Sequence, residues 1–300
     1  MNPEDNFLPR FPLGEGVDAG FRWLKENWKP FFDLLKDGMK FLVEGLSEVL
    51  LAVPAIPAIV IFALIAWFLR SWKLAVGTVI TFTLVLMMDK WVSMMQTMSL
   101  VIIATLFAVI IAVPVGIWAA RNDTVSAIVK PVLDFMQTMP AFVYLIPAVT
   151  FFSIGAGPAL VATIIFSLPP GVRMTELGIR QVDAETVEAG HAFGATSRQI
   201  LRGIQLPLAV PTIMAGINQL IMLALSMAVI AGMVGLDGLG KDVVESISTL
   251  KLPLGVEAGI AVVFLAIYLD RLTAALGRPG DFPSSLRSLL KQRRETQKTA

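Results

Sequence analysis

The sequence is short of the residues on which most enzyme chemistry depends. Among its 300 residues there is no cysteine, one histidine and only two tyrosines. The lack of cysteine excludes disulfides, thiolate nucleophiles and cysteine-ligated metals. A single histidine leaves little material for general acid–base catalysis. No clustered nucleophile, base or metal ligands are visible along the chain, so we expect a non-catalytic protein that binds no cofactor of its own.

Charged residues are also scarce. They make up 16% of the chain, against 56% hydrophobic residues and a mean hydropathy of +0.74, whereas soluble domains carry about a quarter charged residues. The net charge of +1 gives no reason to expect nucleic acid as a partner. The first residues lack the apolar run of a signal peptide. This composition predicts an integral membrane protein whose main surroundings are a lipid bilayer.

Long apolar runs divide the chain into membrane-spanning segments. A transmembrane helix needs about 20 apolar residues, and runs near that length indicate an all-α polytopic protein of about seven spans. Internal prolines such as Pro114 and Pro147 are tolerated where neighbouring helices cover the freed backbone groups. The predicted spans are residues 49–69, 74–88, 98–119, 141–154, 159–172, 208–234 and 254–269.

The distribution of lysine and arginine predicts the orientation. The loops and tail on the carboxy-terminal side of seven spans carry fifteen of these residues, and the opposite loops carry only Lys90, Lys241 and Lys251. The positive-inside rule then puts the carboxyl terminus in the cytoplasm and the amino terminus outside. We expect an external amphipathic segment at 1–48, a transmembrane domain at 49–273 and a basic cytoplasmic tail at 274–300. Within 1–48, the alternative is a soluble helical hairpin packed on itself.

A polar loop at 173–207 separates two of the spans. Asp183 is placed to cap a short helix that ends near Phe193, and Gly194 follows where a chain leaving a helix often needs a positive φ. Thr196 or Ser197 is placed to cap a second short helix that ends before Pro207. Two short helices with apolar residues on more than one face indicate a docking element in the cytoplasm.

The spacing within this loop resembles the coupling loop of ABC importer permeases. That pattern reads E-A-A, three residues, G, nine residues, I-x-L-P, and the sequence departs from it only in having glycine at the third position. Glycine there weakens a helix by up to about 1 kcal/mol relative to alanine. The residues that carry the resemblance are Glu188, Ala189, Gly190, Gly194, Ile204, Leu206 and Pro207.

The resemblance extends over roughly residues 50–277 to permeases of glycine betaine and proline betaine importers. It rests on stretches such as "LDFMQTMPAFVYLIP" and "FSLPPGVRMTELGI". It implies a bacterial inner-membrane subunit of the type I fold, with a five-helix core and peripheral helices. It further implies a homodimer, an ATPase partner that holds ATP and Mg²⁺, and an extracytoplasmic substrate-binding protein. Because the chain extends only about thirty residues past its last span, we expect that binding protein to be a separate polypeptide.

Two further groups are candidates for the pathway or its gate. Asn218, Gln219 and Ser226 lie in the sixth span, where polar side chains either line a pathway or bond neighbouring helices together. The resemblance implies that Gly235, Gly238 and Gly240 allow a tight turn at the external mouth of the pathway. The same stretch partly matches a nucleotide-binding P-loop, but Asp242 stands where that motif needs Ser or Thr.

Other functions remain open at this stage. The family resemblance does not separate glycine betaine from choline or carnitine. A secondary carrier driven by ions would need paired ionisable groups near the midplane, and the predicted spans contain no such pair of acids.

Overall fold

The computed structural model describes residues 12–277 and 282–288. Within them the chain is helical and contains no β-strand, as the sequence predicts. Four described helices are long and apolar enough to cross a membrane, and two bent helix pairs bring the total to six if each pair is one span. The four are α5 (Trp91–Arg121), α8 (Ala156–Arg180), α13 (Leu252–Gly277) and the helix Ser197–Val234, most of which is α11 (Leu206–Ala231).

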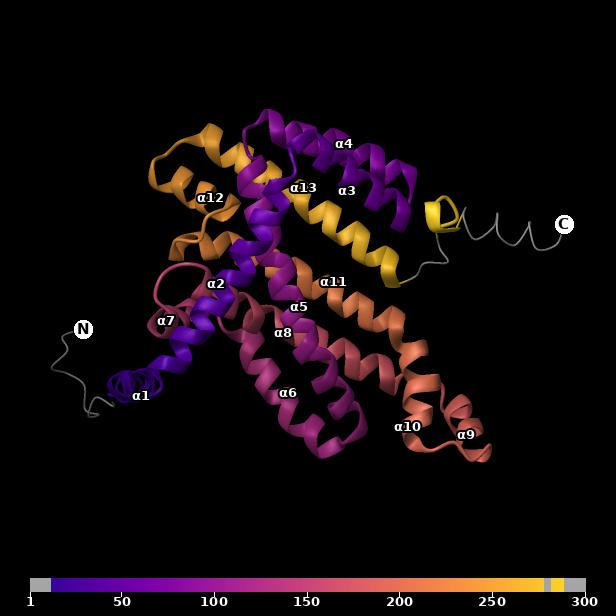
Figure 1. Cartoon of the computed structure of the whole chain (residues 1–300). Coiled ribbons are helices and arrows are strands. Elements are labelled where there is room, and N and C mark those ends of the chain that lie inside the picture. The colour runs from indigo at the N-terminus through magenta and orange to yellow at the C-terminus, as the bar shows by residue number, and fades with distance from the viewer. Residues whose placement is uncertain (1–11, 278–281, 289–300) are drawn as a thin grey trace, which may run out of the picture.

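Helix α8 is the centre of the bundle, packed between α5 and α11 (Figure 1). Its contact faces consist largely of small residues, such as the buried Ala159 and Ala162 of α8 and Ala224 of α11. At Gly216 of α11, an added Cβ would lie 2.5 Å from the Cβ of Met174 on α8. Small residues allow membrane helices to approach closely and gain van der Waals contact.

Two proline-containing breaks produce the bent pairs. Helix α2 (Lys29–Ala52) meets α3 (Ala55–Leu69) at 103°, and α6 (Asp123–Thr138) meets α7 (Ala141–Phe152) at 98°. In both breaks the residue before the proline is extended, Val53 with ψ 126° and Met139 with ψ 132°, because proline disfavours the helical conformation of the residue that precedes it. The prediction of one uninterrupted span at 49–69 was therefore wrong, and α6 was missed as the partner of the span at 141–154.

Other predicted bounds also shift. The apolar run at 74–88 is confirmed as a helix, α4 (Trp72–Met87), but its 16 residues are short for a span. It forms a hairpin with α3 that packs on α13. Helix α8 continues through Pro169 and Pro170 to Arg180, so the first eight residues of the predicted loop at 173–207 are helical. Packing against α5 and α11 supports the backbone where proline removes hydrogen bonds.

The amino-terminal helices lie at the opposite end of α8 from the segment that follows Arg180. The Ser99 hydroxyl of α5 donates to the Val43 carbonyl of α2 over 2.5 Å. The Phe32 ring of α2 stacks on Phe151 of α7 with ring centroids 4.6 Å apart. Helix α1 (Leu13–Asn27) ends before Trp28, and Pro30 occupies the first turn of α2, where its missing N–H has no cost. Residues 1–11 of the predicted external segment, and most of the predicted basic tail, lie outside the described residues.

Candidate functional site: a projecting helical knob and its anchor

Residues 183–205, here called the knob, project from the end of α11 (Figure 1). Its first helix is α9 (Ala184–Ala192), capped as predicted by Asp183, whose carboxylate accepts from the Thr186 backbone N–H over 3.2 Å. The Thr186 hydroxyl and N–H hold the pKa of Asp183 below its ordinary value. The helix ends at Phe193, and Gly194 has φ +80°. The predicted cap and the predicted positive φ are both confirmed.

The second half of the knob is continuous with α11. Thr196 caps α10 (Ser197–Ile200) in a reciprocal arrangement with Gln199, which confirms the predicted cap. The predicted end before Pro207 was wrong. A π-helical turn, η2 (Leu201–Gln205), leads directly into α11, so the helix continues past Pro207. A local π turn accommodates a proline within a continuous helix. The second half of the knob is therefore a direct extension of a membrane-spanning helix.

The inner and outer faces of the knob differ in character. Gly190 is buried between α9 and the following helix, and an added Cβ would lie 2.9 Å from Cδ1 of Ile204. Leu206 is half-buried and packs with the cluster around Ile179 and Leu201. On the outer face the Phe193 side chain is 93% exposed. The Phe193 ring is therefore accessible to a partner at the tip of the knob, and aromatic rings are frequent among the residues that anchor interfaces. The other predicted coupling residues are exposed: Glu188, Ala189, Gly194 and Pro207.

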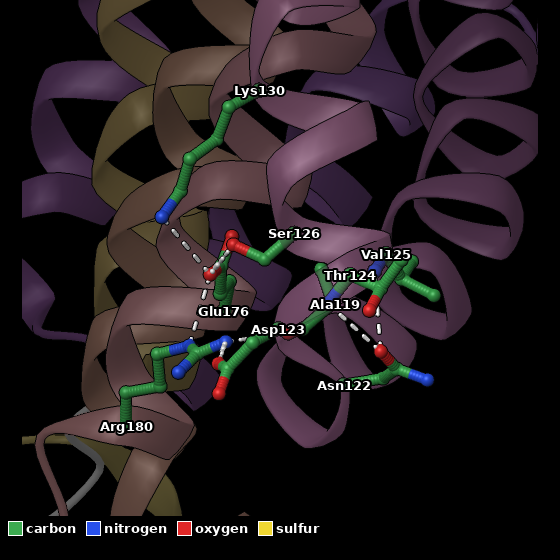
Figure 2. Close-up of polar contacts among 9 residues, drawn as sticks. All are labelled: Ala119, Asn122, Asp123, Thr124, Val125, Ser126, Lys130, Glu176 and Arg180. Atoms are coloured by element: carbon green, nitrogen blue, oxygen red, sulfur yellow. Dashed lines mark hydrogen bonds and ion pairs between the residues drawn. The ribbon is translucent and has the colours of Figure 1, made fainter.

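A buried carboxylate lies at the base of the knob, one turn before the end of α8. Glu176 is only 4% exposed, and Figure 2 shows three side chains converging on it. The Ser126 hydroxyl donates to its Oε1 over 2.7 Å, Arg180 Nε lies 2.9 Å away, and Lys130 Nζ lies 3.4 Å away. Ser126 and Lys130 belong to α6, so this carboxylate joins α6 to α8.

Arg180 extends this group of contacts to the corner between α5 and α6. Its Nη2 donates to Asp123 Oδ1 and to the Ala119 carbonyl, each over 2.8 Å (Figure 2). At the same corner, Asn122 caps α6 by accepting from the Thr124 N–H over 2.9 Å. We call Glu176, Arg180, Ser126, Lys130 and Asp123 the anchor network. It fixes the last turn of α8 immediately before the knob begins.

Sequence reasoning missed the anchor network because it assigned residues 173–180 to a solvated loop. The spacing of four between Glu176 and Arg180 was a visible signal, since such pairs face each other on a helix. The contribution of Ser126 and Lys130, about fifty residues earlier, was not visible. It arises from the bend between α6 and α7, which brings α6 alongside α8.

At its other end α11 finishes in a tight turn, residues 232–242, here called the glycine turn. Gly235 and Gly238 have φ of +79° and +137°, which confirms the predicted turn. Gly240, in the first turn of α12 (Leu239–Ser248), lies against α11, where an added Cβ would be 2.5 Å from the Ala228 carbonyl oxygen. The Thr97 hydroxyl of α5 accepts from the Leu239 N–H over 2.9 Å. The turn is therefore held against the start of α5 and the last turn of α11.

The polar residues of α11 separate into two groups. Asn218 donates to Asp270 of α13 over 2.5 Å and accepts from Thr273 of the same helix over 2.6 Å. Asn218 therefore bonds two neighbouring helices together, which is one of the two roles that the sequence left open. It also lines a cavity of about 320 Å³ with Arg70 and Arg271. Gln219 and Ser226 are exposed on another face of the same helix.

Comparison with known proteins identifies the family. Residues 112–278, more than half of the chain, match the model for the binding-protein-dependent transport system inner membrane component. The chain belongs to this family. The matched region contains α6 to α13, and hence the knob, the anchor network and the glycine turn.

Individual relatives are similar over most of their length. The chain is 49% identical to the glycine betaine transport system permease protein OpuAB of Bacillus subtilis, over 89% of this chain and 94% of that protein. It is 46% identical to the glycine betaine/proline betaine transport system permease protein ProW of Escherichia coli, over 89% and 75% respectively. It is also 46% identical to the glycine betaine/carnitine transport permease protein GbuB of Listeria monocytogenes, over 90% and 97%.

A solved structure supports the fold. A chain of the MetNI methionine ABC transporter, crystallised in inward-facing conformations, superposes with a TM-score of 0.56. The superposition covers 61% of this chain and 92% of that chain at 23% identity. This likeness shows the helical permease fold of an ABC importer and carries no information about substrate.

Proposed function

We propose that the chain is the membrane-spanning permease subunit of an ATP-driven importer, and that the knob receives the motion of an ATPase subunit. The observation that carries this proposal is the rigid knob itself. It continues without a break into α11, and Phe193 at its turn is almost fully exposed. A partner that grips the knob would therefore move a spanning helix directly.

The proposed partners follow from the family and from the chemistry of the chain. ATP and Mg²⁺ would be held by a separate ATPase, because the one stretch that partly matches a P-loop follows the helix α11, and a P-loop follows a strand. A separate extracytoplasmic protein would deliver the solute, and two copies of the permease would enclose the pathway. The exposed Gln219 and Ser226 of α11 are the proposed pathway residues, with the glycine turn as the gate at the outer end.

The proposed substrate is a quaternary ammonium compatible solute, glycine betaine or proline betaine. The names of the relatives from Bacillus subtilis and Escherichia coli support this choice. Carnitine is a second candidate, because the relative from Listeria monocytogenes, 46% identical, is named for glycine betaine and carnitine. Competition of each solute against labelled glycine betaine uptake separates them.

The proposed orientation puts the knob in the cytoplasm of a bacterium and the glycine turn and α2 on the outer side of the inner membrane. The excess of lysine and arginine on the knob side supports it. Since the chain has no cysteine, a single introduced cysteine can be labelled to find its side of the membrane, with no background from native thiols. Asp237→Cys should react with an impermeant maleimide in intact cells, and Ser197→Cys only after lysis.

The function is tested by Gly194→Val in proteoliposomes that contain the permease, its ATPase and its binding protein. A β-branched residue is strained at φ +80°, so the direction of the knob should change while the spans remain folded. We expect ATP-driven, vanadate-sensitive glycine betaine uptake to fall by at least about tenfold, with normal insertion of the permease in the membrane.

Gly203→Val is the matched control. Gly203 lies in the same knob, also with open space around its Cβ position, but its φ is not positive. Uptake should be retained in this variant. Normal coupled uptake by Gly194→Val at normal expression would show that the knob does not couple the two subunits.

A further inference from the structure

We infer that Glu176 is the positioning residue through which the knob moves α6, so that the anchor network is part of the coupling machinery. This inference rests on the proposed function. It adds a second route from the knob into the membrane, separate from the continuous helix α11.

The first step of the route joins the knob to Glu176. Only three residues separate Arg180, the last residue of α8, from the start of α9 at Ala184. Arg180 Nε lies 2.9 Å from the Glu176 carboxylate. A displacement of α9 therefore acts directly on the turn of α8 that carries both residues.

The second step joins Glu176 to α6. Ser126 and Lys130 are one helical turn apart on α6 and both contact Glu176 Oε1. The carboxylate is almost completely buried, and a charge-assisted hydrogen bond in such a site is strong and directional. Glu176 thus holds α6 at a fixed position against α8.

The third step carries the motion of α6 to the middle of the bundle. Helix α6 ends at the 98° bend before α7. Across this bend the Tyr144 hydroxyl of α7 donates to the Met136 carbonyl of α6. Tyr144 packs in a buried cluster with Ala162 of α8 and Met227 of α11. Tilting α6 therefore shifts a cluster that contacts α11 near the proposed pathway residue Ser226.

A purely structural pair between the same helices is available for comparison. Arg173 of α8 pairs with Asp134 of α6, with side chains 39% and 64% exposed, and Arg173 lies two turns from the end of α8. Exposed pairs of this kind contribute little. Asp134→Asn therefore removes a carboxylate from α6–α8 contacts without touching the anchor network.

The test compares Glu176→Gln with Asp134→Asn in the reconstituted importer. We expect Glu176→Gln to lower the glycine betaine transported per ATP hydrolysed by about tenfold, while the ATPase still co-purifies. Asp134→Asn should keep the wild-type ratio. A merely stabilising role for Glu176 would lower the yield of folded permease and leave the transport ratio of the surviving protein unchanged.

A second readout measures position. Spin labels at Ile128→Cys on α6 and Glu185→Cys on α9, both exposed, are placed in one copy and paired with an unlabelled copy. The distance between them should have a narrow distribution in the otherwise native chain and a broad one with Glu176→Gln. If Glu176→Gln does not fold, the pair Ser126→Ala and Lys130→Met removes both contacts of α6 with Glu176, while Glu176 stays beside Arg180 and Arg180 keeps its contact with Asp123. That double variant should also lose transport per ATP.

The outcomes distinguish this inference from the proposed function. If Gly194→Val abolishes uptake and neither anchor variant changes the transport ratio, the knob couples through α11 alone and the role of Glu176 is overturned. If Gly194→Val leaves uptake intact, the proposed function itself fails. A lower ratio with a broadened distance in the anchor variants supports both.

Discussion

Glycine has a different structural role at each end of α11. At one end, Gly194 turns the knob in open space, with no atom within 4 Å of its Cβ position. At the other end, Gly232 and Gly240 bring two backbones together, and an added Cβ on Gly232 would lie 2.3 Å from the Gly240 carbonyl carbon. Gly194 is needed for its φ and Gly232 and Gly240 for their lack of volume, although Gly235 and Gly238 of the glycine turn also have positive φ.

The charged residues at the two ends differ in the same way. Glu188 of the knob is exposed, where a partner can reach it. Beside the glycine turn, Lys90 Nζ lies 3.3 Å from Asp242 Oδ2, with side chains only 12% and 19% exposed. In the knob, the Glu188 carboxylate is accessible to a partner, as expected for a docking element. Beside the glycine turn, Lys90 and Asp242 instead pair with each other in a nearly buried site, whereas the Asp237–Lys241 pair of the turn is exposed.

The largest expected effect follows from close packing in the glycine turn. In Gly240→Ala the new Cβ would lie 2.5 Å from one carbonyl oxygen of α11 and 2.6 Å from the next, and backbone atoms cannot yield as a flexible side chain does. We expect a loss of about 3 kcal/mol in unfolding free energy, measured as a lower thermal midpoint of the purified permease in detergent. Gly194→Ala, which meets no atom, should cost about 1 kcal/mol through strain at positive φ. Equal losses of unfolding free energy in the two variants would contradict the inferred difference between close packing in the glycine turn and open space around Gly194.

An intermediate effect is expected from the Lys90–Asp242 pair. Lys90→Met leaves the Asp242 carboxylate nearly buried without a partner and should cost about 2 kcal/mol. The neighbouring Lys241 provides the control, since it pairs with Asp237 at 2.6 Å with side chains 54% and 63% exposed. Lys241→Met should cost less than about 0.5 kcal/mol. Thermal unfolding midpoints of both variants check this prediction. A similar loss of unfolding free energy in each would show that burial does not determine how much an ion pair contributes to stability.

Local signals in the sequence predicted the knob well. The caps at Asp183 and Thr196 and the positive φ at Gly194 all depend on residues within a few positions of one another, and such preferences act over one helical turn. The end of the second helix was predicted wrongly because a proline usually stops a helix. Here Pro207 falls in a first turn that follows a π-helical turn.

Features that depend on distant residues could not be predicted. The anchor network joins Ser126 to Glu176 across fifty positions, and the contact of Thr97 with Leu239 spans 142. Hydropathy marked the spans but gave no sign that the runs near Pro54 and Pro140 bend by about a right angle. The direction taken by the chain after the first bend is set by packing of α3 against α4 and α13, and after the second by packing of α7 against α8, which no local pattern records.

The smallest expected effect concerns the one position where the knob departs from the family pattern. Gly190 faces Ile204, and the added Cβ of Gly190→Ala would lie 2.9 Å from the tip atom Cδ1, with Cγ1 of Ile200 at 3.3 Å. A terminal methyl of isoleucine can rotate away, and alanine favours the helix by up to about 1 kcal/mol. We expect the two effects to cancel within about 0.5 kcal/mol and uptake to be unchanged.

Gly190→Val is the contrasting variant, because two branched methyl groups cannot both avoid Ile200 and Ile204 without separating α9 from the helix that follows. Uptake should fall in Gly190→Val and persist in Gly190→Ala, measured in the same proteoliposomes at equal expression. Loss of uptake in Gly190→Ala would mean that the inner face of the knob is as intolerant of added volume as the glycine turn. The two ends of α11 would then differ only in exposure, and the coupling role of the knob would depend on tight packing within it as well as on its accessible outer face.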